Sequence, residues 1–401
     1  MDHVAAYTEK KQSNVTMFRY LVLFLACLRL EVTSYSVTNE VISEPELILA
    51  FVVNRHGDRS PDADELSLSK IADYLKNLTY IEGLEGLTNT GKRRAYQLGK
   101  FLRQRYGSQG LNILSDLYLK DELSVRCTDK ERTKMTALVA MAAAYPPELE
   151  QQWDDGVGKV WQPVPYTTVP LDQDYLRFYS SCPHFTSLLE DAKMAAVNKE
   201  FAPYSDLIPL LMKETGHNFT ENPVLFQTLV DLFKSQMSLG VDIPEWSKPI
   251  LPRLTEASLL AYRLFFKTKD LKMIGGGVLL HKFLETAKAA TTGKAFKKLS
   301  LVSAHDYNMG GLMAVSRVAG DERIMPAYAS LFALELYRSR GGVYSVLPVY
   351  LEQAGQGAAT HLRFHSCPDP YCELEKFKEL TQEYVLPEKD YHRMCTVKTE
   401  L

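Results

Sequence analysis

The sequence predicts an α/β protein in which a mixed, mostly parallel sheet carries helices on both faces, with a helical subdomain inserted. Short, continuous apolar runs such as Leu47–Val53 and Leu299–Ser303 are typical of strands that are buried on both faces, and helical patterns separate them. From Tyr175 to Met273 the strand-like runs disappear and helical stretches dominate. We therefore expect four segments, which are a targeting segment at 1–36, core segments at 37–174 and 274–401, and a helical insert at 175–273.

The elements of the first core segment can be placed in chain order. Leu47–Val53 is the first strand. Thr88–Gly91 is a helix-start signal, apolar residues then recur at helical spacing, and Gly107 ends the helix. Leu123–Cys127 is a second short strand, and we expect Asp129 to cap the helix after it. The apolar face of that helix is expected to contain Leu138, Met141 and Ala142.

In the remainder of the chain, helices are predicted first and strands return later. Val224–Met237 and Leu254–Phe266 have helical spacing, and they dominate the insert. Strand patterns reappear at Leu299–Ser303, Leu331–Tyr337 and Val343–Leu351. Strands interleaved with helices indicate a sheet that is covered on both faces.

The composition excludes some classes of protein. The 401 residues allow one large domain, or a domain with a sizeable insertion. Hydrophobic residues make up 46% and charged residues 24%, as in an ordinary globular protein. The net charge of −3 gives no basic footprint, so we expect no nucleic-acid partner. Any anion site must therefore be built locally from a few arginines.

The N-terminal segment has the layout of a secretory signal peptide. Tyr20–Leu28 is an apolar run of nine residues, preceded by Lys10, Lys11 and Arg19. The run is too short to span a bilayer comfortably, although an uncleaved anchoring helix is the alternative. No second apolar run lies near the C-terminus, so we expect no stable membrane anchor. These features favour a secreted or lysosomal protein.

Two of the three sequons agree with export. Asn77-Leu-Thr and Asn218-Phe-Thr fit the glycosylation pattern, whereas Asn14-Val-Thr lies upstream of the apolar run and is not expected to be presented. A pattern this short often arises by chance, so each sequon is weak evidence by itself.

The cysteines indicate two disulfides. Cys27 would leave with the signal peptide, so five of the six cysteines remain and at least one has no partner within the chain. In an exported protein the others are expected to pair. Cys367 and Cys372 are close enough in sequence to close a small loop. A metal site is the alternative for this spacing, but a second pair at ligand spacing is lacking, so we expect none.

A reactive histidine flanked by arginines follows the first strand. Guanidinium groups in Arg55–Pro61 fit phosphate oxygens bidentately, and they lower the pKa of the His56 imidazolium between them. Gly57 lets the backbone approach a ligand closely. Ligands of open α/β sheets bind beyond the carboxyl ends of strands, where this segment is placed. A charged surface loop is the alternative, but a seven-residue constellation at a strand end favours an anion site.

Two further segments offer polar groups at strand ends. His305 and Asp306 follow the strand Leu299–Ser303, so His305 could donate to a phosphate oxygen and Asp306 could protonate a leaving oxygen. A histidine that caps a helix is the alternative for this pair. Arg126, at the end of Leu123–Cys127, could hold phosphate or could form a structural salt bridge.

Taken together, these segments resemble the histidine acid phosphatases. The resemblance covers roughly residues 45–395 and rests on Arg55–Pro61, on Leu87–Gly91 leading into Tyr96–Tyr106, on Arg126–Asp129 followed by Arg132–Met135, and on Ser303–Asp306. Gln151–Trp153 and Trp161–Pro163 are similar to the arthropod secreted and venom members.

The resemblance implies a fold and a set of roles. The fold is the histidine-phosphatase or phosphoglycerate-mutase-like α/β core with a helical insert. In the implied site, His56 is the nucleophile, Arg55, Arg59, Arg126 and His305 hold phosphate, and Asp306 protonates the leaving group. No metal and no organic cofactor is implied. The implied disulfides are Cys182–Cys395 and Cys367–Cys372, which tie down the C-terminal segment and leave Cys127 unpaired.

Two positions depart from the family pattern. Cys127 stands where the family usually has a small hydroxyl residue, and Asp306-Tyr-Asn-Met309 stands where Thr and apolar residues are more frequent. The second departure touches the pocket wall, so it bears on substrate choice more than on mechanism.

The function expected from the resemblance is that of an acid phosphatase that hydrolyses phosphate monoesters through a covalent phosphohistidine. The substrates would be small phosphomonoesters, with phosphotyrosyl peptides among the candidates, and a homodimer is left open. One alternative is a phytase-like inositol-phosphate phosphatase, which would need extra Lys and Arg around the pocket. Another is a weakly active secreted binding protein.

Overall fold

The computed structural model describes residues 45–396, whose strands form one mixed seven-stranded sheet. The strand order is β2-β3-β1-β4-β5-β6, and β7 pairs with β5. The parallel pairings join β2 to β3 and β3 to β1, whereas the other pairings are antiparallel. The strands are β1 Glu46–Arg55, β2 Leu123–Cys127, β3 Leu299–Ala304, β4 Leu331–Arg338, β5 Tyr344–Leu351, β6 Thr360–His361 and β7 Cys372–Glu373. The predicted mixed α/β fold is confirmed.

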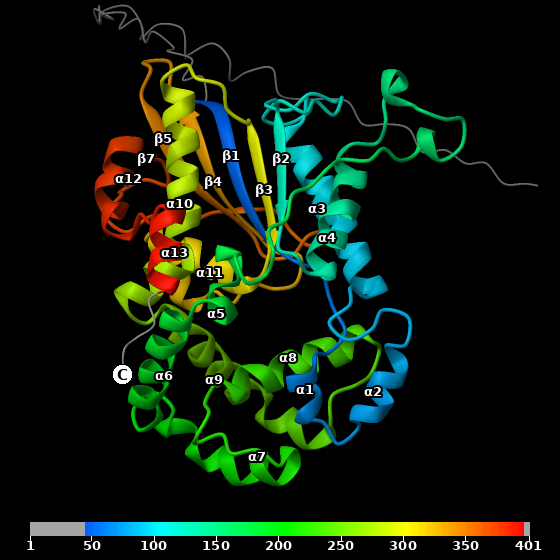
Figure 1. Cartoon of the computed structure of the whole chain (residues 1–401), viewed down its shortest axis with the longest axis vertical. Helices are drawn as coiled ribbons and strands as arrows, with labels where there is room; N and C mark the ends of the chain where they lie inside the picture. The colour runs from blue at the N-terminus through cyan, green and yellow to red at the C-terminus, as the bar shows by residue number, and fades with distance from the viewer. Residues whose placement is uncertain (1–44, 397–401) are drawn as a thin grey trace, which may run out of the picture. The chain divides into compact units, whose positions relative to one another are not determined.

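Helices cover both faces of this sheet and extend beyond its carboxyl-terminal edge (Figure 1). The α-helices are α1 Ala63–Ser67, α2 Ala72–Leu78, α3 Asn89–Tyr106, α4 Glu131–Ala144, α5 Phe178–Ser181, α6 Pro183–Val197, α7 Ile208–Thr215, α8 Leu225–Ser238, α9 Leu251–Arg263, α10 Lys269–Thr291, α11 Asp306–Val315, α12 Leu374–Thr381 and α13 Glu388–Thr396. Short 3₁₀ turns join several of them.

The central strand β1 explains why its sequence is apolar at nearly every position. Phe51 and Val53 belong to the core that contains the buried residues of α10 and α11, whereas Ala50 and Val52 belong to the core beneath α3 and α4. Because both faces are covered, the usual alternation of apolar and polar residues is lost.

Helices α3 and α4 pack so closely that small residues are required between them. A Cβ built on Gly99 would lie 1.9 Å from the carbonyl oxygen of Ala140. The buried face of α4 is accordingly rich in alanine, and Leu138, predicted to lie on that face, is exposed. The predicted cap is also wrong, since Lys130 occupies the N-cap and Asp129 accepts a hydrogen bond from Lys134 at 2.9 Å.

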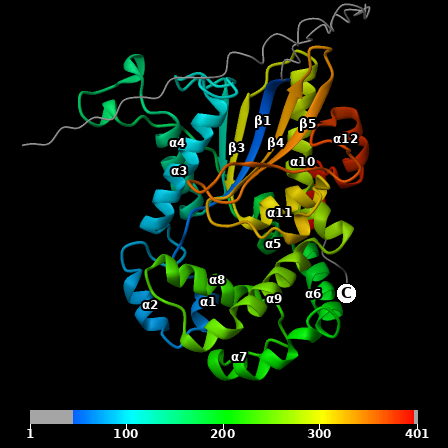
Figure 2. The ribbon, with the colours of Figure 1, turned by 180° about the vertical axis from the view of Figure 1, so that it is seen from behind.

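Helices from two parts of the chain, one directly after β1 and one in its middle, lie beyond the carboxyl ends of β1 and β3 (Figure 1). Figures 1 and 2 both place α1, α2 and α7–α9 there. Two predicted helices are found, because Val224–Met237 corresponds to α8, and Leu254–Phe266 lies within α9 and its 3₁₀ extension. Between Tyr175 and Thr291 the structure has no strand among its described residues. The boundaries of the insert at 175 and 273 stay predictions.

Both disulfides implied by the family resemblance are present. Cys182, just before α6, pairs with Cys395 in α13, so the bridge closes a loop of 213 residues. Cys367 pairs with Cys372. A long closed loop reduces the entropy of the unfolded chain, which stabilises the folded state. Cys127 is unpaired, as predicted, and it is also buried.

The export signals are tested only in part. The predicted signal peptide and Asn14 lie outside the described residues. Asn77 is exposed on α2, and Asn218 is half-buried and donates to Glu221. Glycosylation at both positions stays a prediction. Within residues 45–396, no helix combines the length and the apolar character that crossing a membrane requires.

Candidate active site

Three parallel strands bring the predicted site segments together. Because β1, β3 and β2 are parallel neighbours, their carboxyl ends meet at one edge of the sheet. The amide of His56 donates to the carbonyl oxygen of Ala304 at 3.1 Å, and the amide of Thr128 donates to that of Ser303 at 3.3 Å. The rings of His56 and His305 consequently lie 5.4 Å apart in an edge-to-face arrangement.

A cavity of about 280 Å³ opens at this edge. It is lined mainly by charged side chains from the strand-end loops and from α1, α4, α5, α8 and α11. The predicted residues that line it are Arg55, His56, Arg59, His305 and Asp306, and the others include Glu65, Glu85, Lys130, Arg132, Arg177, Tyr179, Gln227, Asp231 and Tyr307. Five of the six predicted catalytic and phosphate-binding residues are therefore together, whereas Arg126 is absent from the lining.

His56 is held in one tautomer. Its Nδ1 lies 2.8 Å from the carbonyl oxygen of Gly57, which can only accept, so Nδ1 carries the proton and Nε2 keeps a free lone pair. Burial lowers the pKa of His56 well below its usual range, and the positive charges of Arg132, Arg55 and Arg59 lower it further. The sequence had indicated the arginines alone. Burial and these charges therefore favour the neutral imidazole, whose free Nε2 is the nucleophilic form.

Gly57 is required because two backbones touch behind His56. A Cβ on Gly57 would lie 2.5 Å from the carbonyl oxygen of Gly91, near the start of α3. The Gly57 amide donates to Thr136 Oγ1 of α4 at 3.0 Å. The histidine loop is thus anchored to α3 and α4, which fixes the ring relative to the sheet.

The two arginines beside His56 are each oriented by a carboxylate. Arg55 pairs with Asp306 at 3.0 Å, donates to the Pro326 carbonyl at 2.8 Å and lies over the ring of Tyr328. Arg59 makes a bidentate contact with Glu65, at 2.6 and 2.8 Å. Since these guanidinium groups are buried and oriented in advance, they need little rearrangement to receive an anion.

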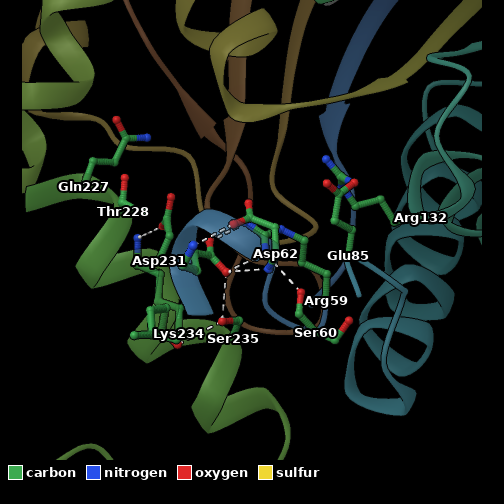
Figure 3. A network of polar contacts seen from close by, with 12 residues as sticks. Arg59, Ser60, Asp62, Glu85, Arg132, Gln227, Thr228, Asp231, Lys234 and Ser235 are labelled. Atoms are coloured by element: carbon green, nitrogen blue, oxygen red, sulfur yellow. Dashed lines mark hydrogen bonds and ion pairs between the residues drawn. The ribbon is translucent and has the colours of Figure 1, made fainter. Parts of the chain in front are cut away.

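Glu65 itself is fixed by the start of α1. It occupies the N3 position of a capping box, in which Asp62 accepts from the Glu65 amide at 2.8 Å and the Asp62 amide donates back to Glu65 at 3.1 Å. The helix start therefore positions Arg59 through Glu65. Figure 3 shows Arg59 and Asp62 of this group beside Asp231 and Ser235 of α8.

Arg126, which we expected to hold phosphate, lies elsewhere. Along β2 successive side chains point to opposite faces, so Arg126 points away from the face that buries Val125 and Cys127. It lines a separate cavity of about 650 Å³ and pairs with the fully buried Asp174 at 2.8 Å. The structural salt bridge, left open as the alternative, is what the structure contains.

Arg132 occupies the position in the cavity that was assigned to Arg126. It is the second residue of α4, it is buried, and its Nη1 donates to Glu85 at 2.7 Å. Burial and the charge of Arg59 lower its pKa, which still leaves a guanidinium protonated at working pH. The signal was available in the sequence, because Arg132–Met135 follows a strand end and opens a helix. The first turn of such a helix is directed at the site.

His305 and Asp306 form the opposite wall. His305 Nε2 lies 3.1 Å from Thr128 Oγ1, and its pKa is lowered well below the usual range by burial first and then by Arg132 and His56. Asp306 is the first residue of α11, where its Oδ1 accepts from the Tyr307 amide at 2.9 Å and its Oδ2 meets Arg55.

Tyr307, the departure from the family pattern, ties this wall to the helical region. Its hydroxyl donates to Gln227 of α8 at 3.1 Å, and its ring stacks on Phe265 at 4.1 Å. Figure 3 shows Gln227, Thr228 and Asp231 of α8 on one side and Glu85 with Arg132 on the other. The cavity is thus closed by groups from both the sheet edge and α8.

No metal centre is found among the residues that the structure describes. Within residues 45–396, no three His, Cys, Asp or Glu side chains are grouped so that they could hold a metal ion.

Comparisons with known proteins agree with this geometry. Residues 46–341 match the family model described as histidine phosphatase superfamily (branch 2). Prostatic acid phosphatase of Homo sapiens is 33% identical over 343 residues, which cover 84% of each chain. Venom acid phosphatase Acph-1 of Apis mellifera is 31% identical, over 86% of this chain and 87% of its own. Lysosomal acid phosphatase of Homo sapiens is 29% identical, over 85% and 78%.

Solved structures show the same fold. A Klebsiella phytase aligns with a TM-score of 0.61 at 16% identity, over 86% of this chain and all of its own. A Citrobacter braakii phytase aligns with a TM-score of 0.60 at 15% identity, over 86% and 99%. At this level of identity the likeness concerns the fold alone.

Proposed function

This chain belongs to branch 2 of the histidine phosphatase superfamily and is an acid phosphatase, and we propose that it hydrolyses phosphate monoesters through a phosphohistidine on His56. The observation that carries the proposal is the state of His56. Its Nδ1 proton is directed to the Gly57 carbonyl, so Nε2 is free to attack within a cavity whose four lining arginines include Arg55, Arg59 and Arg132.

The first step transfers the phosphoryl group to the protein. Nε2 of His56 forms a bond to phosphorus while the bond from phosphorus to the ester oxygen breaks. Arg55, Arg59 and Arg132 neutralise the charge on the equatorial oxygens, as metal ions do in other phosphatases. Asp306 gives its proton to the leaving oxygen, so the alcohol departs neutral.

The second step releases phosphate. Water attacks phosphorus, the bond to Nε2 breaks, and Asp306 takes the proton from the attacking water. His56 and Asp306 thereby return to their starting states. Asp306 must be protonated at the start of each cycle, which favours turnover at acidic pH. In the free protein it pairs with Arg55, so we expect the incoming phosphate to compete for that arginine.

Trapping the intermediate tests the proposal. We expect ³²P from a labelled monoester to appear on the protein after rapid quenching, as an acid-labile and base-stable adduct, and to disappear in His56→Ala. His56→Ala should also abolish turnover while keeping the far-UV circular dichroism of the unsubstituted protein. Label that persists in His56→Ala would remove His56 as the nucleophile.

Because the proposed mechanism uses no metal ion, an assay with EDTA tests it. At pH 5, EDTA should leave the hydrolysis of a small aryl phosphate unchanged, because the guanidinium groups take the part of a metal. A loss of activity that added divalent metal restores would contradict the proposed mechanism.

The cavity favours monoesters over inositol polyphosphates. Arg55, Arg59 and Arg132 form what we call the phosphate cradle. Outside the cradle, the lining offers Lys130 and Arg177 as cations, and Lys130 is already paired with Glu85 at 2.9 Å. A ligand with many phosphates would need more free cations than these. The phytase-like alternative is thus less well supported than an acid phosphatase.

We extend the proposal to surroundings and partners. Relatives named venom and lysosomal acid phosphatases support a secreted or lysosomal location. Phosphotyrosyl peptides are proposed as substrates beside small phosphomonoesters, because the aromatic side chains of Tyr179 and Tyr307 line the cavity. A homodimer stays a prediction, to be checked by sedimentation.

A further inference from the structure

Two cations line the cavity outside the phosphate cradle, and they differ in their surroundings. Lys130 donates to Glu85, whose Oε2 also accepts from Arg132. Arg177 forms no ion pair with any carboxylate among residues 45–396. Its guanidinium lies 4.5 Å from the ring centre of Tyr179, donates to the Tyr179 hydroxyl, and has a buried Nε with no hydrogen-bond partner. The cavity therefore contains one positioned cation without a counter-charge.

Glu85 makes the Lys130 side of the cavity less suitable for an anion than the Arg177 side. Burial alone would raise the pKa of Glu85, but hydrogen bonds from Lys130 and Arg132 lower it to about 2, so Glu85 stays ionised under acidic conditions. It holds this position with a left-handed backbone, at a φ of 62°, which is uncommon for a residue other than glycine. Lys130 therefore already has a counter-charge, which leaves it less available than Arg177 to a second negative group on a substrate.

Arg177 is linked through Tyr179 to the groups that surround the proposed proton donor. Tyr179 connects it to the reacting groups, because the ring of Tyr179 lies 6.0 Å from that of His305 and 5.0 Å from that of Tyr307. Tyr307 follows Asp306, the proposed proton donor to the leaving oxygen. A substituent on the leaving group that extends past Tyr307 and Tyr179 would reach Arg177.

From this geometry we infer that Arg177, positioned by Tyr179, binds a second anionic group on the leaving part of the substrate, either a carboxylate or a second phosphate. A guanidinium with unused N–H groups suits such oxygens, which would also satisfy the buried Nε. The inference rests on the proposed function, since it names the class of phosphomonoester that this site takes. The preferred substrates are monoesters that carry another negative charge.

Three substrates of similar size test this subsite at pH 5. Glycerol 3-phosphate has a neutral leaving part, 3-phosphoglycerate adds a carboxylate, and propane-1,3-diol bisphosphate adds a second phosphate. In Arg177→Met, we expect KM to rise about 10-fold for the two doubly anionic substrates and less than about twofold for glycerol 3-phosphate, with kcat little changed. Arg177→Lys should restore most of the lost affinity, because it keeps the charge. A rise confined to one of the two anionic substrates would identify the group that Arg177 binds.

Lys130→Met is the matched control, because it removes the other cation outside the cradle. It should change the three KM values by one common factor. The inference is overturned if Arg177→Met also changes all three KM values equally, or if Lys130→Met and not Arg177→Met selectively weakens the doubly anionic substrates.

Binding measurements on a protein that cannot turn over separate the proposed function from the proposed Arg177 subsite. In a His56→Ala background, calorimetry should give a lower Kd for 3-phosphoglycerate than for glycerol 3-phosphate, and Arg177→Met should remove the difference. If the protein bearing His56 hydrolyses none of the three, the proposed function fails, while this binding difference still decides on the subsite. If Arg177→Met leaves the Kd of 3-phosphoglycerate unchanged in the His56→Ala background, the proposed subsite is contradicted.

Discussion

Arg126 and Arg132 lie six residues apart in sequence, yet they belong to different regions of the molecule. Arg132 faces the cavity of His56, whereas Arg126 faces a cavity on another side of β2 and pairs with Asp174. The difference follows from their elements. A side chain within a strand points to one face of the sheet, whereas one in the first turn of the following helix points at the carboxyl edge. Arg132 thus lines the candidate active site, whereas Arg126 forms a structural salt bridge.

Activity measurements give the largest expected contrast between the two regions. Arg132→Ala should lower kcat/KM for an aryl phosphate at pH 5 by about 10²–10³-fold, as removal of a preorganised charge at a transition state does. Arg126→Ala should stay within about threefold of the unsubstituted protein. A hundredfold loss in Arg126→Ala would return that residue to the phosphate site and contradict the comparison.

Asp306 lines the same cavity as Arg132, so its substitution should also lower activity. Asp306→Ala should slow alkyl phosphates by about 10²-fold or more, because a poor leaving group needs the proton that general acid catalysis supplies. Aryl phosphates, whose leaving groups need less help, should lose much less. Steady-state kcat on the two substrate classes checks this expectation. Equal losses on both would remove Asp306 as the acid.

For the free energy of unfolding, we expect Arg126→Ala to have a larger effect than Arg132→Ala. Arg126→Ala leaves the carboxylate of Asp174 buried and unpaired, so we expect it to lower the free energy of unfolding by ~3 kcal/mol near pH 7. Burial already raises the pKa of Asp174, and loss of Arg126 removes an opposing charge. The penalty should therefore shrink at acidic pH, where Asp174 can be protonated. Urea unfolding at pH 7 and pH 5 measures both values, and a penalty that grows at pH 5 would contradict this account.

The smallest expected effect concerns the pH dependence of stability in the active-site region. The pKa of His56 in the folded protein lies below its unfolded value near 6.5, so the unfolded state binds more protons below that pH and stability falls as the pH falls. His56→Gln removes this term. Compared with the unsubstituted protein, it should gain about a few degrees in Tm at pH 4.5 relative to pH 7.5. A Tm difference independent of pH would indicate that His56 is not buried as a neutral ring.

The sequence predicted the fold and the core of the site well for an identifiable reason. Buried strands such as Leu47–Val53 are continuous and apolar, and parallel strands place their following loops at one edge, so His56 and His305 could be brought together in advance. The start of α3 at Thr88 and its end at Gly107 were also correctly placed, because capping residues act locally.

The errors arose where tertiary packing decides. The direction of Arg126 depends on which face of β2 is covered by α3 and α4, and the exposure of Leu138 depends on how closely those two helices approach. Glu85 and Arg177 carried no local signal, because their roles come from neighbours that are distant in sequence. Glu85 meets Lys130 and Arg132, and Arg177 lies in the same cavity as α8.

The buried Cys127 has a consequence for the covalent integrity of the molecule. Thiol–disulfide exchange requires a thiolate with access to the bridge it attacks. Burial raises the pKa of Cys127 to about 12, and its side chain has no exposed surface. In an oxidising compartment, the folded protein can therefore carry an odd thiol without exchanging partners with Cys182–Cys395 or Cys367–Cys372. Cys127 is protected in this way as long as the part of the protein that buries it stays folded.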